Sequence, residues 1–179
     1  MLQTTKKELC SRFEMTDLGR LKYFLGMEID QDVTSGNVSI CQTKFAADIL
    51  EKFSMENSNP VETPQDRGLK LIKNMFEGGC NHETLMAHIP YLNAFGCLMY
   101  LIIETRPDLA AVAGVLSQFD LNLCPTHWQA LKRVFRYVQG TKTHGIMFQA
   151  KDPKGIEGYS DADWAGNMDT RRSTSGYAS

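Results

Sequence analysis

The fold of this chain is decided by residues 91–140, YLNAFGCLMYLIIETRPDLAAVAGVLSQFDLNLCPTHWQALKRVFRYVQG. The first part of this stretch, residues 94–103, contains only apolar or small side chains, which predicts a helix that is buried on most of its faces. The run is far shorter than the roughly 20 residues that a membrane-spanning helix needs. We therefore interpret it as a helix of the folded core.

Two more helices are predicted in the same stretch. Pro107 cannot continue the hydrogen-bond ladder of the first helix. Thr105 and Asp108 have the spacing of an N-cap residue and its N3 carboxylate, so we expect the second helix to start there. The third helix is predicted at residues 125–140, because proline is favoured just inside a helix start and glycine just past a helix end.

The third helix has two faces. Its apolar residues recur at steps of three and four positions and predict one buried stripe, formed by Trp128, Leu131, Val134, Phe135 and Val138. Lys132, Arg133 and Arg136 lie on the other side. A helix anchored by its apolar stripe could track a phosphate backbone with these basic side chains. On spacing alone a solvated polar face is the simpler interpretation, and both readings stay open.

Shorter elements flank this stretch and complete an α+β fold. In chain order we predict a helix at residues 4–13, an antiparallel hairpin at 21–41 with strands at 21–30 and 38–41, a helix at 43–53, a strand at 144–149 and an alternating segment at 156–164. Gly26 inside the first strand suggests a bulge or the close approach of another backbone. Residues 54–83 contain several prolines and glycines and are expected to form a long surface connection.

Composition limits the classes of function. The net charge of the 179 residues is -2, so the chain as a whole does not attract nucleic acid. The charge is uneven, however, because residues 121–154 contain six basic side chains and one acidic side chain. The five cysteines form no CxxC pair, and the first residues lack the apolar core of a signal peptide. We expect an intracellular protein, in a cytoplasmic particle or the nucleus, that is not secreted.

Ordered motifs run along almost the whole chain. They are Phe13-Glu-Met-Thr-Asp-Leu-Gly19, Lys22-Tyr-Phe-Leu-Gly-Met-Glu28, Val61-Glu-Thr-Pro64, Gly96-Cys-Leu-Met-Tyr-Leu101, Thr105-Arg-Pro-Asp108, Arg136-Tyr-Val-Gln-Gly140, Gly158-Tyr-Ser-Asp-Ala-Asp-Trp-Ala-Gly166 and Asp169-Thr-Arg-Arg-Ser-Thr-Ser-Gly-Tyr177. The first six, in this order, resemble the reverse transcriptase of copia-type LTR retrotransposon Pol polyproteins. The last two resemble the start of the ribonuclease H domain in the same polyproteins.

The resemblance implies a division into two parts. Residues 1–150 would be the C-terminal part of a reverse transcriptase, with a palm remnant, a primer-gripping hairpin at 21–41, and a helical thumb and connection. Residues 151–179 would be the truncated start of a ribonuclease H domain and would form a β-hairpin. The polymerase centre of the family is an adjacent pair of aspartates, and no Asp-Asp pair occurs in this sequence. We therefore expect no polymerase activity from this chain alone.

The resemblance also implies an incomplete metal site. Asp161 matches the first catalytic aspartate of the ribonuclease H family, and Asp163 projects from the same face if both lie in a strand. Two-metal hydrolysis needs several carboxylates from different elements. We expect Mg²⁺ in the intact parent enzyme and no bound cofactor in this chain alone.

The expected partners are an RNA–DNA hybrid or another primer–template nucleic acid, bound weakly, and the rest of the Pol polyprotein, with no membrane. The candidate contact residues are Lys132, Arg133, Arg136, Lys142 and Tyr23. Tyr23 could stack on a primer end, although a tyrosine on an apolar strand face usually packs. A non-catalytic nucleic-acid-binding module and a non-functional product of a decayed element are the alternatives.

Other candidate sites are weaker. Cys80, His82 and His88 lack a fourth zinc ligand and fit no common zinc spacing, so we interpret them as surface side chains. His127 is interpreted as a first-turn helix residue rather than a catalytic base.

Overall fold

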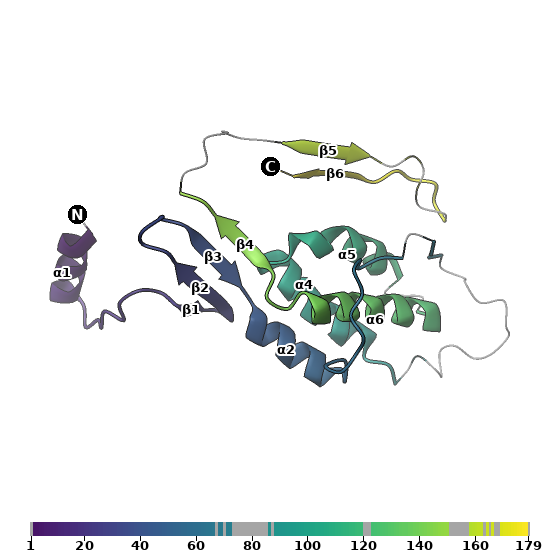
Figure 1. Cartoon of the computed structure of the whole chain (residues 1–179), viewed down its shortest axis with the longest axis horizontal. Coiled ribbons are helices and arrows are strands. Elements are labelled where there is room, and N and C mark those ends of the chain that lie inside the picture. Colours follow the sequence, from purple (N-terminus) through teal and green to yellow (C-terminus); the bar gives the residue numbers. More distant parts are fainter. Residues whose placement is uncertain are drawn as a thin grey trace.

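The computed structural model of this chain describes residues 2–66, 68–69, 71–72, 86, 88–119, 123–150, 158–162, 164, 166 and 169–178. Helices and strands are mixed within these residues, which confirms the α+β class (Figure 1). The helices are α1 (Leu2–Arg12), α2 (Thr43–Lys52), α4 (Tyr91–Glu104), α5 (Ala110–Leu116) and α6 (Pro125–Gly140), with 3-10 turns η1 (Pro107–Leu109) and η2 (Ser117–Phe119) beside α5. The strands are β1 (Tyr23–Phe24), β2 (Met27–Gln31), β3 (Val38–Cys41), β4 (Gly145–Phe148), β5 (Tyr159–Ala162) and β6 (Ser175–Ala178).

The hydrophobic core lies among α2, α4, α5 and α6 (Figure 1). The apolar run predicted at residues 94–103 lies inside α4, where Leu98 and Leu101 are fully buried. The rings of Phe53 and Phe135 stack at 5.3 Å and join the end of α2 to α6. Replacing one buried leucine or phenylalanine of this core by alanine would lower the free energy of unfolding by about 2–5 kcal/mol.

A buried arginine ties the corner between α4 and α5 to the end of α6. Arg106 is 2% exposed and donates two hydrogen bonds to the Asp108 carboxylate, at 2.9 and 2.8 Å. It donates two more to Thr141, one to the backbone carbonyl at 3.0 Å and one to Oγ1 at 2.8 Å. Because Thr141 is the C-cap residue of α6, Arg106 satisfies a carbonyl that the helix itself leaves unpaired.

The predicted capping box at Thr105 and Asp108 was wrong. Thr105 Oγ1 donates to the side-chain oxygen of Gln42, at 2.8 Å and away from solvent, while Asp108 accepts from Arg106 and from the Tyr137 hydroxyl. Burial works to raise the pKa of Asp108, but its hydrogen bonds and its attraction to Arg106 outweigh burial and lower that pKa. Burial, together with the hydrogen bond to Asp108, raises the pKa of Tyr137.

The main sheet has the order β1-β2-β3-β4, with all neighbours antiparallel. The predicted hairpin is present as β2 and β3, whose register pairs Ile29 with Ile40. The strand predicted at residues 144–149 is present as β4, and it pairs with β3 by placing Ile146 opposite Ile40. The segment after α6 therefore returns to the sheet that precedes α2.

The predicted strand at residues 21–30 is divided by a tight turn. Leu25 and Gly26 both have positive φ, at 48° and 79°, and they connect β1 to β2 as a two-residue hairpin loop of type I′. The Tyr100 hydroxyl donates a hydrogen bond to the Leu25 carbonyl and holds this turn against α4. Gly26 thus marks a turn, neither the bulge nor the approach of another backbone that its position suggested.

Two segments stand apart from the core. Strands β5 and β6 form a separate two-stranded sheet, and the side chains described in residues 158–177 are all exposed (Figure 1). Helix α1 lies at the far end of the molecule, where Lys6 forms an ion pair with Asp17 at 2.9 Å (Figure 1). In the part of the chain that the structure describes, no helix is long and apolar enough to cross a membrane.

Candidate nucleic-acid interface

Helix α6 has the bounds that the sequence predicts and carries most of the candidate contact residues. Pro125 occupies its first turn, and a capping box at its start joins Cys124 and His127. The buried stripe consists of His127, Leu131, Val134, Phe135 and Val138, while Trp128, expected in the stripe, is half-buried. The helix is therefore fixed to the core by one face and leaves its basic residues on the other.

The His127 side chain stabilises the start of α6 in its neutral form. Its Nδ1 accepts from the backbone N–H of Cys124 at 3.1 Å, so its Nε2 carries the proton and donates to the Ile72 carbonyl at 3.2 Å. The ring also stacks on Phe119 at 4.1 Å. Burial lowers the pKa of His127, against the raising effects of Ile72 and Asp169. His127 is thus a helix residue, as predicted, and a buried neutral one.

The candidate basic residues lie on the side of α6 away from its buried stripe and just beyond the helix, and all four are half-buried. Lys132 places its Nζ 5.4 Å from the centre of the Trp128 ring, which is cation–π distance. Lys142 is half-buried in the turn after the helix. The stretch 132–142 contains Lys132, Arg133, Arg136 and Lys142 and no acidic residue. The local charge is therefore +4 on a chain whose net charge is -2.

The two arginines of α6 contact the segment that follows α2. Arg136 donates from Nε to the backbone carbonyl of Asn59 at 2.7 Å. Arg133 donates from Nη2 to Thr63 Oγ1 at 3.1 Å, and its Nη1 lies 4.0 Å from the Asp66 carboxylate. The two interpretations of this face from the sequence, a solvated face and a face that contacts phosphates, did not predict these contacts. The one signal in the sequence is that residues 54–66 contain acidic and no basic side chains.

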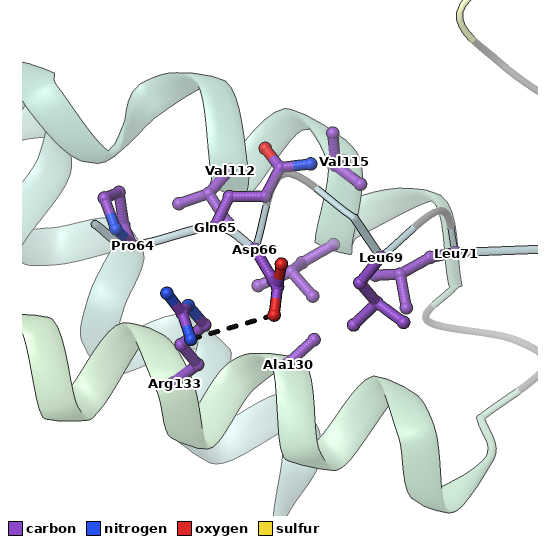
Figure 2. Close-up of a pocket in the computed structure, with 10 residues that line it drawn as sticks. Pro64, Gln65, Asp66, Leu69, Leu71, Val112, Val115, Ala130 and Arg133 are labelled. Carbon is purple, nitrogen blue, oxygen red and sulfur yellow. Dashed lines mark ion pairs between the residues drawn. The ribbon is translucent and has the colours of Figure 1, made fainter. Parts of the chain in front are cut away.

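A surface pocket lies between this segment, α5 and α6. Figure 2 shows the Arg133–Asp66 ion pair at one side and the apolar side chains of Val112, Val115 and Leu69 around the space. The pocket holds about 290 Å³ of empty space, part of it open to solvent. It is mostly apolar, so it is a poor site for a phosphate.

Tyr23 lies in β1, away from α6 in the sequence and outside the hydrophobic core. Tyr23 is 54% exposed, and it lies opposite Glu28 of β2 in the sheet. An exposed aromatic ring can stack on a nucleic-acid base without loss of core packing.

Of the two expected magnesium ligands, the structure describes Asp161. Asp161 is exposed in β5 opposite Gly176, and its carboxylate accepts from the backbone N–H of Ala162 at 2.9 Å. Asp163, the second expected ligand, lies outside the described residues. Among the residues that are described, no group of three His, Cys, Asp or Glu side chains could hold a metal ion. Magnesium takes six ligands in octahedral geometry, so Asp161 would need further ligands beside it to hold this ion.

The zinc candidates are placed only in part. Cys80 and His82 lie outside the described residues, and His88 is exposed in the turn before α4.

Comparisons with known proteins place the chain in a family. Residues 1–67 match the family model described as reverse transcriptase (RNA-dependent DNA polymerase). The chain is 40% identical over 177 residues to the retrovirus-related Pol polyprotein from transposon TNT 1-94 of Nicotiana tabacum, an alignment that covers 99% of this chain and 13% of the polyprotein. It is 37% identical over 177 residues to the retrovirus-related Pol polyprotein from transposon RE1 of Arabidopsis thaliana, covering 99% of this chain and 12% of that one.

A shorter relative is similar over part of the chain. The chain is 61% identical over 92 residues to the secreted RxLR effector protein 161 of Plasmopara viticola, covering 51% of this chain and 65% of the relative. No solved protein structure matches the chain. The chain spans 13% and 12% of the two polyproteins, whose similarity nevertheless extends over nearly all of its own residues. The chain therefore belongs to the Pol polyprotein family of copia-type retrotransposons.

Proposed function

We propose that this chain is the part of a copia-type Pol polyprotein that holds a primer–template RNA–DNA duplex, and that it neither polymerises nor cleaves nucleic acid alone. In this proposal residues 1–150 are the end of the palm, the primer-gripping hairpin, and the thumb and connection. The hairpin is β2–β3, and the thumb and connection are the helices from α4 to α6. Residues 151–179 are the start of a ribonuclease H domain, represented by β5 and β6.

The observation that carries this proposal is the local charge of +4 along residues 132–142, which comprise the C-terminal part of α6 and the start of the turn after it. Basic side chains on an anchored helix contact phosphates through charge and hydrogen bonds, and the binding does not depend on base sequence. Tyr23 adds an exposed aromatic ring for base stacking on a second element. These are the features that gripping a duplex requires, and none of them supplies chemistry.

The set of carboxylates in this chain supports the proposed lack of activity. Nucleotidyl transfer and hydrolysis by two metal ions both need several convergent carboxylates. The sequence contains no adjacent aspartate pair, and Asp161 is a solvated carboxylate on an exposed strand. In the intact polyprotein Mg²⁺ would supply this chemistry, with further ligands from outside this chain.

The test is binding of the purified chain to a fluorescent RNA–DNA hybrid, measured by anisotropy at several salt concentrations. Each phosphate contact makes the slope of log K against log salt more negative by about 0.9, so four contacts predict a slope of roughly -3 to -4. The double variant Lys132→Gln, Lys142→Gln loses two contacts, so its slope should be less negative by about 2. Lys7→Gln, Lys44→Gln is the matched control, because it removes two exposed lysines outside α6 and should leave the slope nearly unchanged.

Two binding results would contradict the proposal. One is binding that shows no salt dependence, or no binding by any form of the chain. The other is an equal loss of slope in both double variants, which would mean that only the overall charge matters. Metal-dependent nucleotide incorporation or hybrid cleavage by the purified chain would contradict the proposed lack of catalytic activity.

A further inference from the structure

The segment between α2 and the pocket lies along the basic face of α6. We name residues 54–66 the strap. Three α6 side chains that are three positions apart bind it in reverse order: Gln139 donates to the Glu56 carbonyl at 2.6 Å, Arg136 to the Asn59 carbonyl and Arg133 to Thr63. Since i and i+3 positions share one helix face, the strap runs antiparallel to α6 along that single face.

The strap also approaches the helix backbone. A Cβ atom at Gly140 would lie 3.0 Å from the Cβ of Pro60, closer than most real contacts of this kind. Glycine at this position therefore lets the strap pack directly on the end of α6. Met55, at the start of the strap, is buried in the hydrophobic core and anchors that end.

The charges of the two segments are complementary. The strap contains Glu56, Glu62 and Asp66 and no basic residue, so it carries a charge of -3. Helix α6 contains Lys132, Arg133 and Arg136 and no acidic residue, so it carries +3 with its histidine neutral. The strap thus offers α6 what a nucleic-acid strand offers, which is negative charge and oxygen acceptors at regular intervals.

We infer that the strap is an internal competitor of nucleic acid for Arg133 and Arg136. With the strap docked, one arginine hydrogen-bonds a backbone carbonyl and the other a threonine hydroxyl and a carboxylate. A phosphate that contacts either guanidinium fully must displace these partners. The ion pair at 4.0 Å joins partly exposed side chains, so it is weak and the displacement is accessible. The inference rests on the proposed function, since it regulates the same basic face.

The first test compares two strap variants of equal charge. Asp66→Asn removes the ion pair to Arg133 but keeps the side-chain oxygen that accepts from the Gly68 N–H at 3.0 Å. Glu62→Gln removes one charge from the same strap, and Glu62 has no ion pair among the described residues. Affinity for the hybrid should rise about two- to fivefold in Asp66→Asn, the range of a surface ion pair, and clearly less in Glu62→Gln.

The second test locks the strap onto the helix. Pro60→Cys, Gly140→Cys places two thiols where a disulfide can form after a small outward shift of the strap, since disulfides need about 3.5–4.5 Å between Cβ atoms. Peptide mapping confirms the bond. The oxidised protein should bind the hybrid about tenfold more weakly than the same protein after reduction, with a salt slope shallower by about 2, because two phosphate contacts are lost.

The outcomes separate this inference from the proposed function. Equal rises in Asp66→Asn and Glu62→Gln, or equal binding by the oxidised and reduced forms, would overturn the competition while salt-dependent binding by the wild type keeps the proposed function. If no form binds the hybrid at any salt concentration, the proposed function fails and the inference fails with it. Tighter binding by Asp66→Asn than by Glu62→Gln, together with weaker binding by the locked form, supports it.

Discussion

Arg106 and Thr141 are 35 positions apart and are joined by two hydrogen bonds, at 3.0 and 2.8 Å. This link fixes the C-terminal end of α6 to the corner between α4 and α5. The same guanidinium also binds Asp108 in a bidentate pair, so one buried side chain holds two elements. Together with the apolar stripe of α6, this arginine therefore helps to fix the orientation of the helix and of its basic face.

Arg106→Lys should therefore be strongly destabilising although it preserves the charge. A lysine has no planar fork and cannot bind the Asp108 carboxylate and the Thr141 carbonyl together, so a buried cation would lose part of its hydrogen bonds. We expect the free energy of unfolding to fall by about 2–3 kcal/mol in urea denaturation. Arg20→Lys is the control, because Arg20 is exposed and its replacement should change stability by less than about 0.5 kcal/mol. Equal effects of the two variants would disprove the link.

The buried imidazole of His127 should make stability depend on pH. The pKa of His127 in the folded state is lowered by burial. Its contribution to the free energy of unfolding is therefore complete above the unfolded value of 6.5. Below that value the unfolded chain binds the proton more readily, and the free energy of unfolding falls as the pH decreases through the folded pKa. The urea midpoint of the wild type should drop between pH 7.5 and pH 5.5.

His127→Gln should reduce this pH dependence, because glutamine keeps one acceptor and one donor and does not titrate. His144→Gln is the matched control, since His144 is exposed before β4 and the variant should keep the wild-type dependence. A His127→Gln protein whose midpoint falls as steeply as that of the wild type would show that another group is responsible.

The left-handed backbone of Leu25 predicts a stabilising substitution. A non-glycine residue at φ 48° is strained, and the first position of a type I′ turn favours asparagine before glycine. Leu25 is exposed, so Leu25→Asn loses little buried surface and should raise the free energy of unfolding by about 0.5–1 kcal/mol. Leu18→Asn, at an exposed site that does not have a positive φ, should give no gain in the same thermal denaturation measurements.

The helices could be predicted from the sequence because their signals are local. Pro125 and Gly140 bound α6, and the apolar run of α4 needs no distant partner to be recognised. The turn at Leu25 was missed because its stability depends on Tyr100, which is far away in the sequence. A leucine is also an unusual residue for a type I′ turn, so the alternation of residues 21–30 predicted an unbroken strand.

The contacts of the basic face were missed for a similar physical reason. Spacing shows that Arg133 and Arg136 share a side of a helix, but it cannot show what covers that side. The strap reaches them through a backbone carbonyl and a hydroxyl, and neither group has a recognisable sequence pattern. The structural role of Arg106 was likewise missed, because nothing local indicates that it is buried.

The exposed ring of Tyr23 predicts a loss of affinity that does not involve charge. Stacking of one base on an aromatic side chain contributes about 1–3 kcal/mol, so Tyr23→Ala should weaken hybrid binding by that amount and leave the salt slope unchanged. Tyr23→Phe keeps the ring and should bind like the wild type. Tyr177→Ala removes an exposed tyrosine from β6 and serves as the control. Since Tyr23 is 54% exposed, thermal denaturation should show little change in stability, so a weaker complex reflects the lost contact. Wild-type affinity of Tyr23→Ala would exclude Tyr23 from the interface and leave Lys142 and the basic residues of α6 as the remaining candidates.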